Sequence, residues 1–164
     1  MRRSAILAVA AAIASLLAGV AIASGAGARA GAVVKTRHTS LGTIVANAKG
    51  RTLYLFMKDK NGKSACSRQC ATYWPPLLTS AKPRAGAGVK ASLLGTTRRA
   101  NGRLQVTYNK HPLYAFSGDT GPGSTAGEEV KAFGADWYAI SPAGAKVEKK
   151  SSSSGGGGYG GYGG

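Results

Sequence analysis

The chain has 164 residues, and its 22 lysine and arginine side chains against six aspartates and glutamates give a formal net charge of +16. Six acids and two histidines offer no obvious paired carboxylates and no catalytic triad, which argues against an acid–base or nucleophilic enzyme. A surface this basic attracts polyanions without sequence selectivity. No helix-turn-helix, zinc-finger or RNA-binding sheet signature is present, so a specific nucleic acid is not an expected partner.

The N-terminus is typical of an exported protein. Two arginines precede an apolar run over residues 5–23 that ends in small residues, as in a secretory signal peptide. We expect a signal peptide over 1–23, with Ala28 and Ala30 as alternative cleavage sites to Ala23, and a disordered linker over 24–31. An uncleaved membrane anchor is the alternative, since the run is near the lower length limit for a span. No cysteine there could carry a lipid.

One small β domain is expected over 32–148. In its first part a strand over Thr43–Ala46 leads through a turn at 47–50 into a strand over Thr52–Met57. The second strand is apolar on both faces, which predicts a central strand covered on both sides. A short helix over Cys66–Tyr73, capped by Ser64, should end before the prolines at 75 and 76.

The segment 82–90 is rich in glycine, alanine and proline and is expected to be a linker. Beyond it, Asn101-Gly102 predicts a hairpin turn into an alternating strand over Leu104–Tyr108. A turn at 109–112 then leads into Leu113–Phe116. A second short helix over Glu128–Phe133, a strand over Asp136–Ser141 and a disordered Ser/Gly/Tyr tail over 149–164 complete the predicted elements.

A short pattern occurs twice, once in each part of this domain. Each copy has a tyrosine, an aromatic residue two positions on and an aspartate five positions after the tyrosine, followed later by a tryptophan: Tyr54, Phe56, Asp59 and Trp74, then Tyr114, Phe116, Asp119 and Trp137. Such a repeat indicates a duplicated unit that need not bury its apolar face alone. We predict a mainly β fold, a small antiparallel β-domain of two similar repeats at about 41–80 and 93–142, each with a short helical excursion.

The repeated residues have two interpretations. Residues five apart in a strand point to opposite faces, so each aspartate should follow its strand and accept backbone N–H groups that fix a turn. The aromatic side chains could line a ligand groove between the halves, but aromatic residues at strand spacing are more often core.

These residues resemble a bacterial secreted-repeat family of unknown function, predicted lipoproteins with a Tyr-x-aromatic-x-x-Asp motif. The resemblance rests on Gly50–Asp59, on Cys66 and Cys70 with the Trp-Pro-Pro-Leu segment at 74–77, and on the second copy from Pro112 to Trp137. It implies export and life at the cell surface, often through a lipid anchor. This chain lacks the lipid-bearing cysteine, so we expect a released or wall-associated protein that is not lipid-anchored.

Cys66 and Cys70 are the only cysteines. In an oxidising compartment a nearby pair is most simply a disulfide, which would contribute about 2 kcal/mol for so short a loop. The alternatives are a redox pair, or a copper site formed by both thiolates with His111. His111 lies in a turn, aligns with Arg51 in the other copy and is more simply a solvated residue.

The leading hypothesis is an exported cell-envelope protein without enzymatic activity, a binding or structural module at the cell surface. Its basic surface makes anionic wall polymers or lipid headgroups the expected partners. The alternative is an extracytoplasmic redox or copper-handling protein that uses the Cys66/Cys70 pair.

Overall fold

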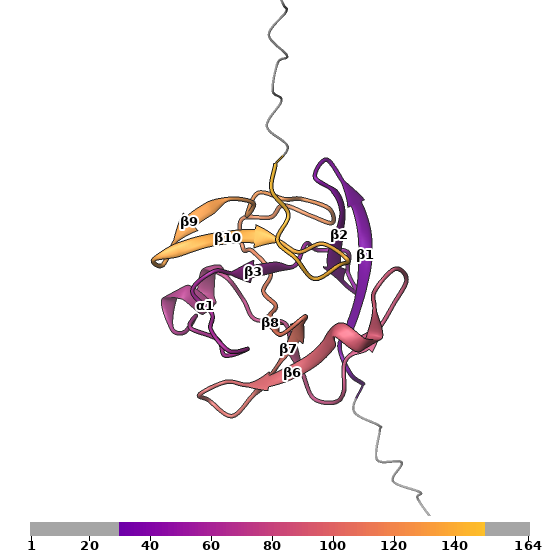
Figure 1. Ribbon diagram of the computed structural model, residues 1–164. Helices are drawn as coiled ribbons and strands as arrows, with labels where there is room; N and C mark the ends of the chain where they lie inside the picture. Colours follow the sequence, from indigo (N-terminus) through magenta and orange to yellow (C-terminus); the bar gives the residue numbers. More distant parts are fainter. Residues whose placement is uncertain (1–29, 150–164) are drawn as a thin grey trace, which may run out of the picture.

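A computed structural model describes residues 30–149 (Figure 1). Almost all of this part of the chain is strand, turn or loop, with one short α-helix and one 3-10 turn. In chain order the elements are β1 (Val33–Thr39), β2 (Gly42–Asn47), β3 (Tyr54–Phe56), α1 (Gln69–Tyr73), β4 (Leu78–Thr79), β5 (Arg84–Ala85), η1 (Ala91–Leu93), β6 (Leu94–Arg98), β7 (Leu104–Tyr108), β8 (His111–Pro112), β9 (Val130–Ala132) and β10 (Ala135–Ala139).

The strands form three small sheets. One has the order β2-β1-β5, the second β3-β10-β9, and the third β4-β7-β6 with β8 also paired to β7. Every pairing is antiparallel except that of β1 with β5. The prediction of a mainly β, antiparallel domain made of two similar repeats is therefore confirmed.

The two copies of the repeat share two of the three sheets. β3, from the first copy, pairs with β10 from the second, so that Tyr54 lies opposite Ala139 and Phe56 opposite Trp137. β4, also from the first copy, pairs with β7 from the second. In Figure 1 β3 runs beneath β10 near the centre of the molecule. The first copy thus contributes one strand to each of two sheets that are otherwise made by the second copy.

β3 separates two hydrophobic clusters. Tyr54 and Phe56 belong to an aromatic cluster, whereas Leu53 and Leu55 belong to an aliphatic cluster. Successive side chains of a strand point to opposite faces, which explains the division. All four side chains are at most 2% exposed, as expected for a central strand. The strand is shorter than expected, since the ladder covers only Tyr54–Phe56 of the segment 52–57.

The first predicted helix is too long. α1 begins at Gln69, because Arg68 has a positive φ of 50° that no right-handed helix contains. Ser64 does not cap it; the Ser64 hydroxyl accepts a hydrogen bond from Arg99 Nη1 and lies 2.8 Å from Tyr114 Oη instead. The helix does end at Tyr73, directly before Trp74 and the two prolines, as predicted.

The second predicted helix, over Glu128–Phe133, is wrong. Glu129 and Phe133 both have positive φ, at 59° and 56°, and between them Val130–Ala132 forms β9. β9 pairs with β10 through the tight turn at Phe133 and Gly134. The helical excursion is therefore confined to the first copy in the described part of the chain.

Four further segments differ from expectation. The expected linker 82–90 contains β5, which pairs with β1 and places Ala87 O within 2.9 Å of Thr36 N. The strand expected over Leu113–Phe116 is reduced to bridges of Tyr114 with Tyr54 and Pro76. β1 and β6 were not anticipated, whereas β7 matches its predicted bounds.

The expected signal peptide over 1–23, most of the linker over 24–31 and the tail beyond 149 lie outside the described residues. Within the described residues, the helices are too short and not apolar enough to cross a membrane.

Candidate functional site

The two motif tyrosines meet at the centre of the fold. Tyr54 N donates to Tyr114 O at 2.8 Å, and Tyr114 N donates to Tyr54 O at 3.0 Å. This reciprocal backbone pair joins equivalent residues of the two copies. The two copies are therefore joined at the equivalent tyrosines of their motifs.

Each tyrosine hydroxyl forms a hydrogen bond with the aspartate of the other copy. Tyr54 Oη lies 3.1 Å from both carboxylate oxygens of Asp119, and Tyr114 Oη donates to Asp59 Oδ2 at 2.8 Å. The repeat pattern therefore describes two interlocked pairs, Tyr54 with Asp119 and Tyr114 with Asp59. The sequence places tyrosine and aspartate in one copy and contains no signal for this exchange.

Each aspartate also fixes the turn that follows it, as the sequence predicted. Asp59 Oδ1 accepts from Ala65 N at 2.7 Å, and Asp119 Oδ1 accepts from Ala126 N at 3.0 Å. Ser124 Oγ adds a further bond to Asp119 at 3.1 Å. These bonds satisfy carboxylates that are largely removed from water.

Burial and charge determine the protonation of this cluster. Burial, reinforced by the neighbouring aspartate charge, raises the pKa of Tyr54 and of Tyr114 far above the usual value of 10.0. Burial also raises the pKa of Asp59 and Asp119, against their hydrogen bonds. Both tyrosines therefore stay protonated at neutral pH and serve as hydrogen-bond donors, which fits a structural role in holding the two copies together.

The motif aromatics form a column of four rings. Ring centroids are 4.0 Å apart for Phe56 and Trp137, 3.9 Å for Trp137 and Trp74, and 4.3 Å for Trp74 and Phe116. Residues of the two copies alternate along the column. Both tryptophans are at most 1% exposed, so the column is core and does not line an open groove.

Gly127 closes the aromatic cluster on one side. A Cβ at this position would lie 2.8 Å from the Tyr54 ring and 2.9 Å from the Trp74 ring. Its N–H donates to Tyr54 Oη at 3.2 Å. Only glycine allows the backbone to approach the two rings this closely.

Cys66 and Cys70 form a disulfide, with Cα atoms 5.3 Å apart. Both residues are buried, at 1% and 6% exposed. His111 lies apart from them, beside the Asp59 turn, and burial lowers its pKa. Within residues 30–149 no three histidine, cysteine, aspartate or glutamate side chains lie close enough to hold a metal ion. The alternative copper set of Cys66, Cys70 and His111 is therefore not assembled.

Two arginines that the sequence analysis did not single out brace the turns of the opposite copy. Arg51 Nη2 donates to Phe116 O at 3.1 Å and to Asp119 O at 2.9 Å. Arg99 donates to Ser64 Oγ, to Cys66 O and to Gln105 Oε1. The only sequence signal was the position of Arg51 directly before the first motif strand.

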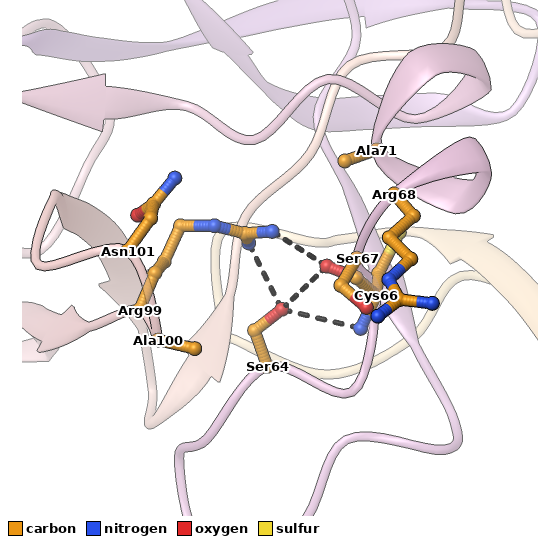
Figure 2. A pocket seen from close by; sticks show the side chains of 8 residues that line it. All are labelled: Ser64, Cys66, Ser67, Arg68, Ala71, Arg99, Ala100 and Asn101. Carbon is orange, nitrogen blue, oxygen red and sulfur yellow. Dashed lines mark hydrogen bonds between the residues drawn. The ribbon is translucent and has the colours of Figure 1, made fainter.

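A pocket lies beside the disulfide, between the loop that leads into α1 and the turn that joins β6 to β7 (Figure 2). Its volume is about 250 Å³. Arg68 and Arg99 contribute the charged lining, with Ser67 and Asn101 as polar neighbours and no carboxylate.

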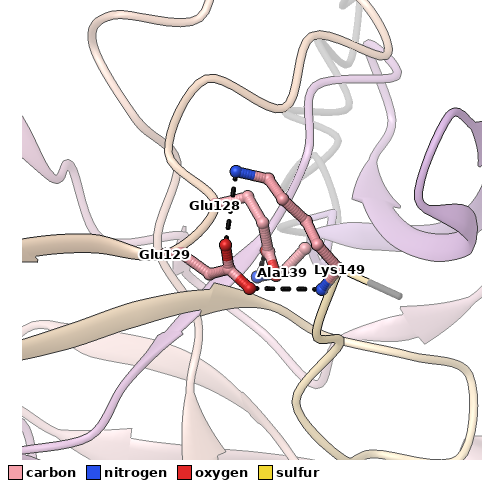
Figure 3. Close-up of polar contacts among 4 residues, drawn as sticks. All are labelled: Glu128, Glu129, Ala139 and Lys149. Atoms are coloured by element: carbon pink, nitrogen blue, oxygen red, sulfur yellow. Dashed lines mark hydrogen bonds and ion pairs between the residues drawn. The ribbon is translucent and has the colours of Figure 1, made fainter. Parts of the chain in front are cut away.

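Glu128 is a buried carboxylate, 5% exposed, that lies against Ala139 of β10 (Figure 3). Its Oε2 accepts from Ala139 N at 2.7 Å, whereas Oε1 has no hydrogen-bond partner among the described residues. Burial raises the pKa of Glu128. The adjacent Glu129 points outward and pairs with Lys149 Nζ at 3.3 Å.

The charges of the described chain are segregated. Residues 30–127 contain fifteen lysines and arginines but only two acids, Asp59 and Asp119, both bonded to tyrosines. The four other acids lie between residues 128 and 148, where Glu129 and Glu148 pair with lysines. Residues 30–127 therefore carry a large excess of positive charge.

The fold and these contacts define a class: a two-copy β module in which each copy supplies the tyrosine that binds the other's aspartate. The family model described as a secreted repeat of unknown function matches residues 35–78 and 95–141, one stretch in each copy. The chain belongs to this family of secreted repeats. Comparison with curated proteins found no match, and comparison with solved structures found none either.

Proposed function

We propose that this protein is a non-enzymatic module of the cell envelope that binds anionic polymers at the cell surface. The charge distribution carries the proposal. Of the fifteen cationic side chains in residues 30–127, twelve are exposed and none is fully buried. None of the fifteen forms an ion pair with a carboxylate of the described residues, whose two ion pairs both involve lysines beyond residue 127.

Electrostatic attraction of this kind recruits polyanions and weakens with salt, because exposed charges are screened beyond about 10 Å at 0.1 M ionic strength. Wall polymers and lipid headgroups are the polyanions that an exported protein meets. The disulfide and the interlocked tyrosines supply a rigid support for the charged loops.

A redox role for Cys66 and Cys70 is not favoured. Reactive cysteines lie in partially exposed sites, whereas both of these residues are nearly inaccessible.

The test is binding of the purified protein to an immobilised anionic polymer across a salt series. Replacing Lys60, Lys63 and Lys110 with glutamine should weaken binding at low salt and flatten the salt dependence. The matched control replaces Lys131, Lys146 and Lys149, which removes the same formal charge from the segment that holds four of the acids. Absent or salt-independent binding, or equal loss in both triple variants, would contradict the proposal.

A further inference from the structure

The pocket beside the disulfide has features that the fold itself does not require. Figure 2 shows Arg99 entering from the β6–β7 turn and Arg68 from the start of α1, with Ser64, Cys66 and Ser67 between them. The two arginines thus line one pocket from different elements. No carboxylate lines that space to neutralise them.

Arg99 is held in place before any ligand arrives. It donates to Ser64 Oγ at 2.9 Å and also to Gln105 Oε1 and Cys66 O. A guanidinium has five N–H groups, so two remain after these three bonds to the described residues. The charge of Arg99 acts on Asp59, which already accepts from Ala65 N and Tyr114 Oη.

Arg68 occupies a backbone position that arginine disfavours. Its φ is 50° and its ψ is −124°, a conformation that glycine or asparagine adopts at lower cost. The side chain is exposed and makes no hydrogen bond or ion pair with the described residues. Folding therefore gives no reason for an arginine here, and strained positions of this kind concentrate at functional sites.

The disulfide fixes this strained residue. Cys66 and Cys70 enclose Ser67, Arg68 and Gln69, and their bond closes the loop over those three residues. Cys66 O is also an acceptor for Arg99, so the same loop connects both arginines. The disulfide thereby gives the pocket its shape.

We propose that this pocket binds one phosphoryl group of the anionic polymer or headgroup that the protein recognises. The inference rests on the proposed function and adds a defined site to it. Arg68 and Arg99 supply guanidinium donors, which match phosphate oxygens in pairs, and Ser67 and Asn101 supply neutral donors. A volume of about 250 Å³ accommodates one such group.

Inorganic phosphate is the first probe, titrated by calorimetry into the intact protein at constant ionic strength. We expect saturation at one site. Arg68→Asn should lower the affinity for phosphate by about tenfold or more, because charge-assisted hydrogen bonds from the guanidinium are lost. Asparagine tolerates a positive φ, so the variant should keep its melting temperature. The control Arg84→Asn removes the same charge from exposed β5 and should change affinity by less than about twofold.

The source of the phosphoryl group is distinguished with polyphosphate and with phosphatidylglycerol vesicles, each offered to both variants. The probe whose binding is weakened by Arg68→Asn and not by Arg84→Asn is the source of the phosphoryl group. No saturation by phosphate, or equal effects of the two variants on every probe, overturns the pocket while leaving salt-dependent polymer binding intact. Phosphate saturation without any polymer or vesicle binding would instead overturn the proposed function and retain the site.

Discussion

Tyr54 and Asp119 lie 65 residues apart, and the Tyr54 hydroxyl donates to the Asp119 carboxylate within the core. The pair Tyr114 and Asp59 repeats this contact in the opposite direction. Two copies of one short pattern therefore stabilise each other through four side chains. The motif residues of one repeat therefore bind mainly to the motif residues of the other repeat, so the motif marks the interface between the repeats.

Tyr54→Phe should lower the free energy of unfolding by about 1–2 kcal/mol, since Asp119 loses a buried donor. Urea denaturation measures the change. Tyr138→Phe is the matched control, because this half-buried hydroxyl makes no hydrogen bond to the described residues. A double-mutant cycle of Tyr54→Phe with Asp119→Asn should show coupling of about 0.5–3 kcal/mol. Comparable coupling to Asp59→Asn, in the same copy, would contradict the crossed arrangement.

Glu128 should make stability depend on pH. Its pKa is raised above 4.5 by burial, so the folded state keeps a proton that the unfolded state has released. The resulting stabilisation is complete below about pH 4.5 and is lost as pH rises through the raised pKa. Glu128→Gln removes this dependence, so it should stabilise the protein more at about pH 8 than at about pH 4.

Urea midpoints across that pH range, at constant ionic strength, measure this difference. Glu148→Gln is the control, because Glu148 is exposed and pairs only with Lys146 on the surface. A difference between Glu128→Gln and the parent protein that does not change with pH would show that the carboxyl titrates normally.

How far the sequence predicts this fold depends on how local the signals are. β7 combines an Asn-Gly turn with strict alternation, and both are local, so its bounds were predicted correctly. β1 has a single buried residue, Val34, and its polar sequence gives no alternation to detect. Residues 128–133 have helix-forming composition, but β10 provides a neighbouring strand with which Val130–Ala132 pairs. Tertiary pairing outweighed propensity there.

The candidate site was predicted in part. The turn-fixing role of each aspartate could be predicted, because an aspartate that follows a strand and precedes turn-forming residues commonly accepts backbone N–H groups of that turn. The crossed tyrosine contacts depend on the packing of two copies, which one sequence does not encode locally. Arg68 could not be identified from the sequence either, because the feature that distinguishes it is a positive backbone φ.

The disulfide should be structural. Alkylation of the native protein, followed by intact mass measurement, should find no free thiol, and elemental analysis should find no bound metal. Replacing Cys66 and Cys70 with serine should cost about 2 kcal/mol of stability through loss of the short closed loop. The variant should retain its β-type circular dichroism. Free thiols, easy reduction of the native protein or stoichiometric copper would instead make this pair the active centre.

Neither copy should fold alone. A half comprising residues 30–90 keeps β3 and β4 but loses β10 and β7, the strands with which they pair. A half comprising residues 91–149 keeps Tyr114 but loses Asp59, and each half retains only two of the four stacked rings. Each would expose an unpaired strand and half of the aromatic core, which a chain of this size cannot offset.

We therefore expect each half to show the circular dichroism of an unfolded chain, while the intact protein unfolds in one cooperative transition. Tryptophan fluorescence and far-ultraviolet circular dichroism should give the same urea midpoint, because Trp74 and Trp137 come from different copies and share one stack. Mixing the two halves should restore the native fluorescence if the pairing of β3 with β10 and of β4 with β7, together with the crossed tyrosines, supplies most of the binding energy. An independently folded half, or two separate transitions in the intact protein, would show that the repeats are separate domains.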